Sequence, residues 1–185
     1  LGLSVKWASF NIGASSEEEK GLLLGWGDIT GLNTSRDLNY FPSLYPKGDI
    51  VNTKYDFVKT SWGDKWRLPS TKETQELIDK CTWTAVEDEN QKVKGYMVTG
   101  PNGNHIYLPC TSKRDGNILD ENNQGCYYWT GMLSSNNSNK ASYLSITTDD
   151  TKNVSTHIDL ENRYMGFAMR PVYGDYQAGI NQQVS

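Results

Sequence analysis

The sequence lacks both long apolar runs and clusters of basic residues. A helix that spans a membrane needs about 20 consecutive apolar residues, and no stretch of these 185 residues approaches that length. The 18 Lys and Arg residues are scattered and are outnumbered by 22 Asp and Glu, which leaves a net charge of −4. Because nucleic-acid phosphates attract basic surfaces, we expect no nucleic-acid partner and no transmembrane segment.

Cysteine is scarce as well, with three residues at Cys81, Cys110 and Cys126. Their spacing fits neither a zinc ribbon nor a CxxC redox pair. The favoured interpretation is three buried thiols that act as small apolar residues, since free cysteine is usually buried. The alternative is a Cys110–Cys126 disulfide, which would close a loop rich in Asp, Asn and Gly.

Motifs that would activate a nucleophile, a metal or a cofactor are also missing. His105 and His157 have no nucleophile at motif spacing and are interpreted as a hairpin residue and a strand-surface residue. Loop acids that could ligate calcium are interpreted instead as solvated turn residues; they are Asp115, Asp120, Glu121, Asp149 and Asp150. We therefore predict no enzyme, no metal and no cofactor, with a hydrolase that uses two loop carboxylates as an open alternative.

Aromatic residues are plentiful, and they compensate for a hydrophobic fraction of only 36%. Six Trp and eleven Tyr can bury much surface per residue and hold a core together. The length is typical of one domain, which we place at residues 1–173. Residues 174–185 are polar and aperiodic and are predicted to form a flexible C-terminal tail.

Local patterns predict one main helix and several short strands. Ser70 and Glu73 have the spacing of a capping box, and a helix is expected from Thr71 to Cys81 with an apolar face. A long irregular loop is expected over residues 27–50 and a polar loop over residues 114–125. Alternation and turn residues predict a short helix at 56–60 and strands at 3–10, 95–99, 105–108, 127–131, 141–147, 154–160 and 167–172.

The segment from Tyr127 to Asn162 has the pattern of a recognition surface. Leu144, Ile146, Ile158 and Leu160 are predicted to point inward, so that their strand neighbours point outward. Tyr, Ser and Asn are typical of adaptable binding surfaces, although they are equally common in plain solvated loops. The candidate contact residues are Met132, Ser134, Ser135, Asn137, Asn139, Ser142, Tyr143, Ser145, Thr147, Thr156, His157, Asp159 and Asn162.

Short motifs also occur in a fixed order along residues 1–173. They are Leu1-Gly2-Leu3-Ser4-Val5-Lys6-Trp7-Ala8, Trp62-Gly63 with Trp66-Arg67-Leu68-Pro69, Gly95-Tyr96, Gly100-Pro101-Asn102-Gly103, Leu108-Pro109, Arg114-Asp115-Gly116, Tyr127-Tyr128-Trp129 and Arg170-Pro171-Val172. This ordered set resembles the Fibrobacter major paralogous domain family of Bacteroidota surface proteins. That family is similar to C-type-lectin-like and formylglycine-generating-enzyme domains.

The resemblance implies a single α+β domain of C-type-lectin-like type, with small twisted antiparallel sheets and one main helix. It also implies that the first strand lies beside the strand at 167–172. The oxidase activity of formylglycine-generating enzymes needs a reactive cysteine pair in the C-terminal part, and no cysteine follows Cys126. That activity is therefore not expected.

Some proteins of this kind look like the variable proteins of diversity-generating retroelements, which display changing residues near the C-terminus. The resemblance therefore implies a ligand-binding protein of the cell envelope or outer surface, lipid-anchored through an N-terminal segment that is missing here. The expected partner is a protein or glycan, and the expected state is a monomer. The alternatives are a structural adhesin or pilus-tip module that docks another subunit, and a glycan-binding or hydrolytic surface lipoprotein.

Overall fold

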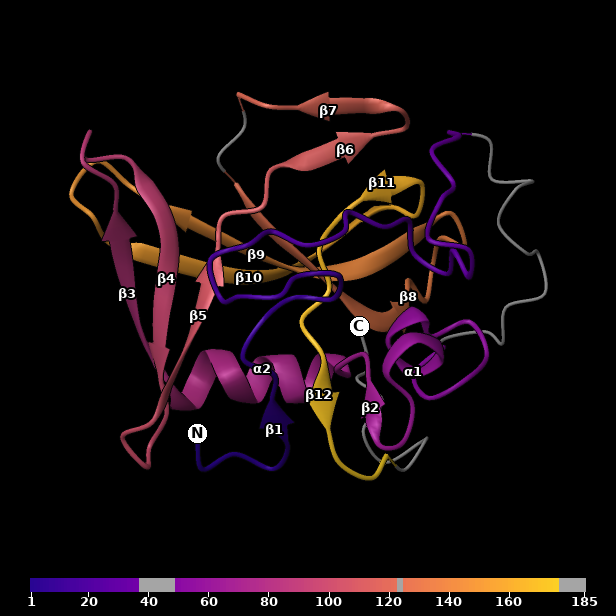
Figure 1. Ribbon diagram of the computed structural model, residues 1–185, viewed down its shortest axis with the longest axis horizontal. Helices are drawn as coiled ribbons and strands as arrows, with labels where there is room; N and C mark the ends of the chain where they lie inside the picture. The colour runs from indigo at the N-terminus through magenta and orange to yellow at the C-terminus, as the bar shows by residue number, and fades with distance from the viewer. Residues whose placement is uncertain (37–48, 123–124, 177–185) are drawn as a thin grey trace.

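The computed structural model describes residues 1–36, 49–122 and 125–176, which form small antiparallel sheets and two helices (Figure 1). This arrangement confirms the predicted α+β class. Neither described helix has the length and apolar character that crossing a bilayer requires. The elements are β1 (Lys6–Trp7), α1 (Phe57–Trp62), β2 (Trp66–Arg67), α2 (Thr71–Lys80), β3 (Thr82–Glu87), β4 (Val93–Thr99), β5 (His105–Pro109), β6 (Lys113–Asp115), β7 (Ile118–Asp120), β8 (Cys126–Leu133), β9 (Lys140–Thr148), β10 (Val154–Asn162), β11 (Met165–Gly166) and β12 (Val172–Tyr173).

Four three-stranded sheets are seen among the described residues, and their strand orders are β1–β12–β2, β3–β4–β5, β11–β6–β7 and β10–β9–β8. In Figure 1 the sheet β10–β9–β8 crosses the middle of the molecule, with α2 below it and the β6–β7 hairpin and β11 above it. A separate hydrophobic cluster packs against each face of this central sheet. The central sheet is therefore the layer on which the two halves of the core are built.

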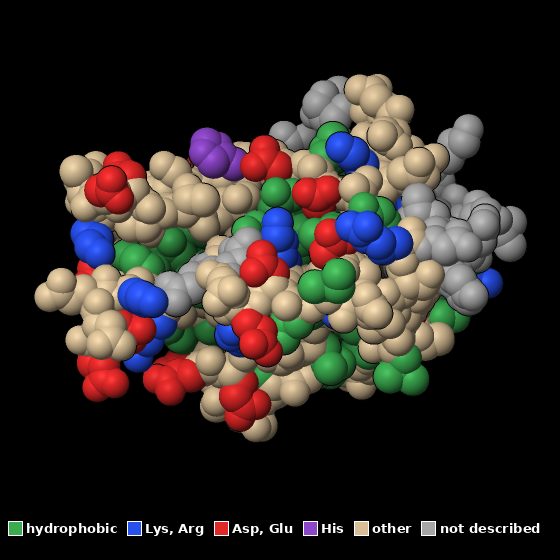
Figure 2. Space-filling view, turned by 90° about the horizontal axis from the view of Figure 1, so that it is seen from above, with side chains coloured by type: hydrophobic (Ala, Val, Ile, Leu, Met, Phe, Trp, Pro, Cys, Tyr) green, Lys and Arg blue, Asp and Glu red, His purple; other side chains and the backbone are tan. Residues whose placement is uncertain are grey.

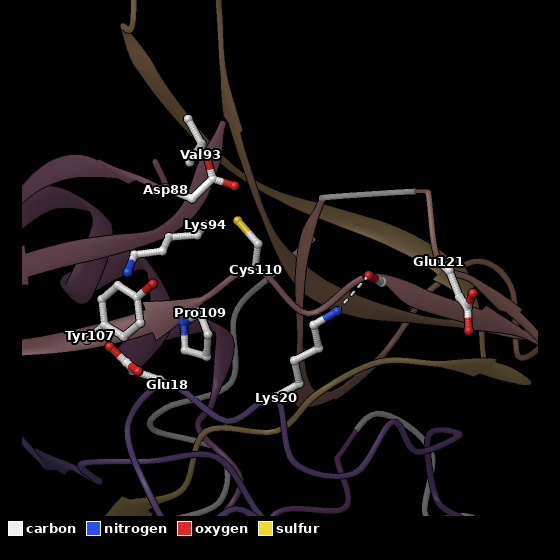
Figure 3. A pocket seen from close by; sticks show the side chains of 10 residues that line it. Glu18, Lys20, Asp88, Val93, Lys94, Tyr107, Pro109, Cys110 and Glu121 are labelled. Carbon is white, nitrogen blue, oxygen red and sulfur yellow. Dashed lines mark hydrogen bonds between the residues drawn. The ribbon is translucent and has the colours of Figure 1, made fainter. Parts of the chain in front are cut away.

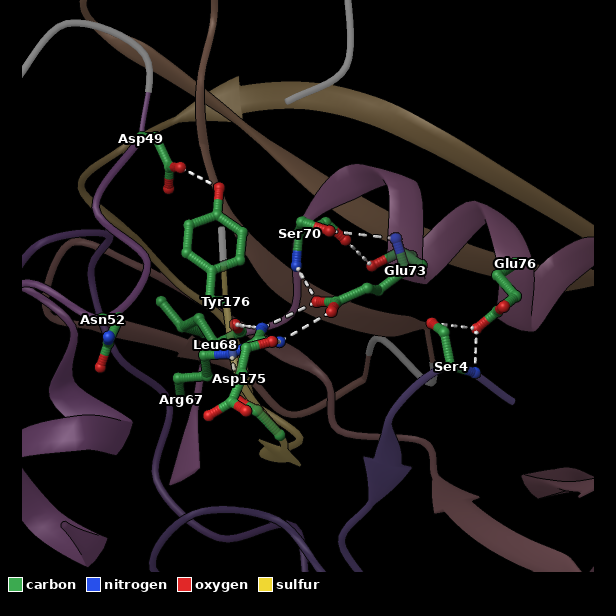
Figure 4. A network of polar contacts seen from close by, with 12 residues as sticks. Ser4, Asp49, Asn52, Arg67, Leu68, Ser70, Glu73, Glu76, Asp175 and Tyr176 are labelled. Atoms are coloured by element: carbon green, nitrogen blue, oxygen red, sulfur yellow. Dashed lines mark hydrogen bonds and ion pairs between the residues drawn. The ribbon is translucent and has the colours of Figure 1, made fainter. Parts of the chain in front are cut away.

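Helix α2 begins as its capping box predicts. The Ser70 hydroxyl accepts a hydrogen bond from the Glu73 amide at 3.1 Å, and a Glu73 carboxylate oxygen accepts from the Ser70 amide at 2.9 Å. Glu73 also binds the buried guanidinium of Arg67, with two N–O distances of 2.8 Å (Figure 4). One side chain therefore caps the helix and neutralises a buried cation from β2.

The expected polar loop at 114–125 is wrong in its first half, because β6 and β7 form a hairpin there. A second strand that was not predicted is β3, which pairs with β4 along its whole length. β6 is a polar segment that is held by its hydrogen-bonding neighbours, whereas β3 contains Thr, Trp and Val, which do favour strands. Residues 37–48 of the expected loop at 27–50 lie outside the described part of the chain.

The first and last strands lie side by side, as the resemblance implied. Lys6 pairs with Tyr173 and Trp7 with Val172, and β12 also pairs with β2. However, the expected strands at 3–10 and 167–172 are not continuous. Residues 167–171 instead exchange single backbone hydrogen bonds with the N-terminal segment and with β8, and Pro171 has no N–H to donate to a ladder.

A buried arginine fixes this crossing segment. Arg170 donates to the Asn11 side chain at 2.8 Å, to the Ala8 carbonyl at 3.0 Å and to the Tyr107 carbonyl at 2.7 Å. Burial lowers the pKa of Arg170 to about 10, so the guanidinium still carries its charge at neutral pH. It therefore joins three segments that are distant in sequence.

The packed chain extends beyond the expected domain end at residue 173. Arg67 donates to the carbonyls of Gly174 at 3.0 Å and Asp175 at 3.1 Å, and its guanidinium carbon lies 4.9 Å from the centroid of the Tyr176 ring. Tyr176 in turn donates to Asp49. The remainder of the expected tail, residues 177–185, lies outside the described residues.

The favoured interpretation of three free thiols is wrong for two of the cysteines. Cys110 and Cys126 form a disulfide across 16 residues, and Cys81 is the free cysteine of the described chain. Both disulfide residues are buried beside the cluster that contains Leu77 and Leu144. Spacing alone could not distinguish this pairing from separate burial, because the two cysteines meet only when β8 lies beside the end of β5.

Replacing Cys110 and Cys126 together by serine is expected to lower the free energy of unfolding by about 3 kcal/mol. The crosslink closes a short loop and so removes entropy from the unfolded chain. Urea unfolding of the double variant, and of the native protein with and without reductant, measures the difference. Cys81→Ser is the control and should change little, since it breaks no crosslink; a native protein that is insensitive to reductant would contradict the prediction.

Candidate ligand-binding face

Side chains alternate cleanly between the two faces of the central sheet. On the face toward α2, Tyr128, Leu144 and Ile158 lie opposite one another across the three strands. Leu144 and Ile146 are almost fully buried, which confirms their predicted inward direction. Ile158 on the outer strand β10 is partly buried. Leu160 is 45% exposed, so its predicted burial is wrong: an edge strand is covered on one side only.

The opposite face brings five of the predicted contact residues together. Ser145 lies between Tyr127 and His157, and Tyr143 lies between Trp129 and Asp159, in the cross-strand register of the sheet. Thr147 continues the same row on β9. Thr147, His157 and Asp159 are exposed, and Tyr143 and Ser145 are partly exposed. We call this set the display face; it consists of Tyr143, Ser145, Thr147, His157 and Asp159.

An aromatic layer packs on the same side of the sheet, beside the exposed part of the display face. The Phe167 ring lies 4.8 Å from the Tyr143 ring, 5.1 Å from Tyr127 and 4.5 Å from Trp129, measured between centroids. Trp129 is itself fixed by a 2.7 Å hydrogen bond from its indole N–H to the Leu24 carbonyl. Tyr143 is itself part of this layer, whose contacts hold β8 and β9 in place. The aromatic contacts do not involve Ser145, Thr147, His157 or Asp159, and these side chains are free to differ.

The Tyr143 hydroxyl stays protonated at every physiological pH. Burial, and after it the nearby carboxylates of Asp159 and Glu161, raises the pKa of Tyr143 to about 12. A protonated phenol can donate and accept hydrogen bonds. Since most of its ring packs inward, Tyr143 offers its edge and hydroxyl to a ligand rather than a fully projecting aromatic plane.

Three predicted contact residues are buried, so the prediction that they lie at the surface is wrong. Met132, Ser134 and Ser142 are each less than a tenth exposed. The hydroxyls of Ser142 and Thr130 hydrogen-bond to each other inside the protein. The Ser134 hydroxyl accepts from the amides of Asn136 at 3.3 Å and Asn137 at 3.2 Å, which shapes the turn that follows. These side chains build the scaffold and are not available at the surface.

The turn between β8 and β9 carries Ser135, Asn137 and Asn139, and all three are exposed. The Asn137 side-chain oxygen accepts from the Asn139 amide at 3.0 Å, so part of its capacity is used within the turn. The amide of Arg163 donates to the Asn139 carbonyl at 2.9 Å. The turn is therefore anchored beside the end of β10, next to the display face but separate from it.

The last two predicted residues do not join the display face. Thr156 lies opposite Ile146 and so faces α2. The Asn162 side chain donates to the Tyr164 hydroxyl at 3.2 Å. Seen from above the sheet, hydrophobic, acidic and basic side chains are interspersed on this side of the molecule (Figure 2).

A cavity of about 350 Å³ lies elsewhere, beside the disulfide (Figure 3). Tyr107, Pro109 and Cys110 line its buried side. Charged side chains from three segments surround it, among them Glu18 and Lys94. Nothing in the sequence indicated this cavity, because its walls come from segments that only the fold brings together.

Several carboxylates of the described chain serve structural contacts. Asp88 accepts from the amides of Asn90 at 2.8 Å and Lys92 at 3.0 Å, and these bonds, that of Lys92 first, lower its pKa. Asp149 caps the β9–β10 turn in the same way, and Asp115 pairs with Arg36 at 2.6 Å. Within the described ranges, no group of three or more His, Cys, Asp or Glu residues is close enough to hold a metal ion.

Comparisons of this chain with protein-family models, with curated proteins and with solved structures found no match.

Proposed function

We propose that the chain is a cell-surface ligand-binding protein that presents a variable recognition face on a C-type-lectin-like scaffold. The observation that carries the proposal is the arrangement of the central sheet. Five residues predicted to contact a ligand share one face, and the residues predicted to fix the backbone of β9 are buried on the other. Such a division of roles lets contact residues vary at little cost in stability.

The chemistry of the display face favours a protein or glycan ligand. Ser145 and Thr147 offer hydroxyls that donate and accept, His157 and Asp159 add groups that can carry opposite charge, and Tyr143 adds a phenol. Hydroxyl and amide groups around a tyrosine are typical of adaptable binding surfaces. The exposed asparagines of the β8–β9 turn extend the same chemistry beyond the sheet.

Two further features support an exported, C-type-lectin-like domain. Disulfides form and persist in oxidising compartments, and the chain contains the Cys110–Cys126 bond. The pairing of β1 with β12 joins the ends of the domain, which is the closure that the resemblance implies. On this proposal the protein lies at the cell envelope, anchored by a lipid on a preceding segment.

Alanine substitutions along β9 are expected to alternate in their cost. Ser145→Ala and Thr147→Ala should change the free energy of unfolding by no more than about 0.5 kcal/mol, whereas Leu144→Ala and Ile146→Ala should cost about 2–5 kcal/mol because each leaves a cavity. Urea unfolding of the four single variants measures this pattern. Equal costs at neighbouring positions would contradict the separation of scaffold from display.

The genomic surroundings test the variable character of the face. A near-identical copy of the segment that encodes residues 127–172 should lie beside the gene and next to a reverse transcriptase. Mismatches should fall mainly at adenines of that copy, in the codons of the display face and of the β8–β9 turn. If no copy exists, the retroelement proposal fails; if mismatches cluster at Leu144 and Ile146, the assignment of the two faces fails.

Binding itself is tested with a library randomised at Ser145, Thr147, His157 and Asp159 and displayed on yeast. The library is selected against a purified protein, such as lysozyme, and against an immobilised glycan. Recovery of folded clones that bind one of these targets is the expected result. A matched library randomised at four exposed positions of the β4–β5 turn is the control, and equal yields from the two libraries would remove the special role of the display face.

A further inference from the structure

The outer edge of β10 is the longest strand edge that no other described strand pairs with. β10 pairs with β9 over nine residues without a register shift. The outer edge of β8, by contrast, is covered by bridges to Ala168 and Asp49. An exposed edge presents unpaired backbone N–H and C=O groups and is a ready template for another strand.

Several features that usually blunt such an edge are missing from β10, although the strand carries the charged residues Asp159 and Glu161. The strand Val154–Asn162 contains no proline, no glycine and no lysine, and it has no bulge. It carries instead an exposed apolar side chain, Leu160. β3 comes close near the beginning of β10, where Lys152, two residues before the strand, lies 3.0 Å from Glu87 at the end of β3. The middle of the edge is therefore open among the described residues.

We propose that β10 pairs with β10 of a second copy of this chain, antiparallel and about a two-fold axis at Ile158. Registers that keep like faces together place the axis on a residue, since a one-residue slip would set the display face of one copy against the α2 face of the other. An axis at Asp159 would oppose two like charges, which destabilises a sheet. An axis at Ile158 sets each His157 opposite the partner's Asp159.

In this register, each exposed side chain of the strand lies opposite a side chain of the partner that it can contact without a clash of like charges. The His157–Asp159 pair occurs twice by symmetry, because an isologous interface repeats each contact. Leu160 lies opposite the partner's Thr156 and diagonal to the partner's Ile158, so its exposed apolar surface becomes covered. Glu161 lies opposite the partner's Ser155 and meets no like charge. The sequence of the strand is thus complementary to itself in this register.

The dimer would contain a continuous six-stranded sheet. A two-fold axis perpendicular to the sheet keeps both α2 helices below it and both display faces above it. Residues from both copies would then meet in the middle of one surface. The test measures mass rather than ligand binding, so the dimer and the proposed function can fail separately. His157 and Asp159 belong to both surfaces, and a dimer paired through them would leave Tyr143, Ser145 and Thr147 as the display-face residues that contact a ligand. The dimer replaces the monomer expected from the sequence.

Charge exchange tests the register. The native chain should form a dimer of twice 20.8 kDa in sedimentation or light-scattering measurements at rising concentration. His157→Asp places two carboxylates opposite each other at two symmetric positions, and Asp159→His does the same with two imidazoles. Each single substitution should weaken self-association about tenfold or more. The double variant restores opposite partners and should dimerise like the native chain. The two single variants, when mixed, should form a heterodimer for the same reason.

Three results would overturn the proposal. They are a native chain that stays monomeric up to several hundred micromolar, a dimer that ignores both single substitutions, and a double variant as weak as the single ones. Both positions are exposed, so circular dichroism and thermal unfolding should show each variant folded. A double variant that is folded but monomeric would point to contacts outside β10.

A cysteine crosslink provides an independent measurement. Ile158→Cys places the two introduced thiols next to each other on the axis, within the range that a disulfide spans. Ser155→Cys places its two thiols about six residues apart along the strands, roughly 20 Å, and is the matched control. Oxidation should give a covalent dimer for Ile158→Cys alone, with Cys81 replaced by serine in both proteins. Equal crosslinking at the two positions would overturn the register.

Discussion

Replacing Glu73 by glutamine is expected to lower the free energy of unfolding by about 3–5 kcal/mol, because removing one partner of a buried ion pair leaves the other charge uncompensated. Glu73 and Arg67 are both almost fully buried. The carboxylate accepts from both terminal nitrogens of the guanidinium and from the Ser70 amide. Glutamine keeps the shape but turns one acceptor into a donor that faces the cation.

The same helix provides a matched control for this substitution. Glu76 accepts from the Ser4 amide and hydroxyl at 3.0 and 2.8 Å, and it lies 3.6 Å from Lys80 at the surface. Glu76→Gln should cost no more than about 1 kcal/mol, since exposed pairs contribute little. Urea unfolding with a common slope compares the two variants. Equal losses of stability in the two variants would contradict the prediction, because the buried Arg67–Glu73 pair would then contribute no more than the pair at the surface.

Phe167→Ala is expected to cost about 3–5 kcal/mol and to loosen the display face. The ring is almost fully buried and is the common neighbour of Tyr127, Trp129 and Tyr143. Its removal leaves a cavity that three aromatic rings cannot all fill. Near-ultraviolet circular dichroism should lose aromatic signal in the same variant, because these rings are no longer held in one arrangement.

Phe10 is the control for Phe167. Its ring is partly exposed and packs edge-on against Trp62 at 5.9 Å, outside the central sheet. Phe10→Ala should therefore cost less and should leave ligand selection from the display-face library unchanged. If Phe167→Ala unfolds like the native protein, the aromatic layer does not support the face.

Features with a local cause could be predicted from the sequence. Helix α2 starts where Ser70 and Glu73 indicate, because both partners of a capping box lie within one turn. Strands β9 and β10 follow from alternation, which placed Leu144 and Ile146 inward and Ser145 and Thr147 outward. The disulfide, the Arg170 crossing and the cavity depend on contacts between distant segments and left no local pattern.

The misplaced site residues have a physical explanation. The register between β8 and β9 shifts between Trp129 and Leu133, so alternation no longer predicts the direction of Met132. Ser134 turns inward because its hydroxyl satisfies two amides of the tight turn. Leu160 faces α2 but remains exposed because it lies on the edge strand. Periodicity predicts the direction in which a side chain points on a regular strand. It does not predict whether another element covers that side chain and buries it.

The pairing of β1 with β12 has a consequence for the order of folding. A ribosome makes the chain from its N-terminus, so Lys6 and Trp7 emerge long before Val172 and Tyr173 exist to pair with them. β2, made in between, also waits for β12, since the late strand is the centre of that sheet. Contacts this distant in sequence are slow to form. This sheet therefore cannot close on a nascent chain until Val172 and Tyr173 have been made, and its first two strands remain without their central partner until then.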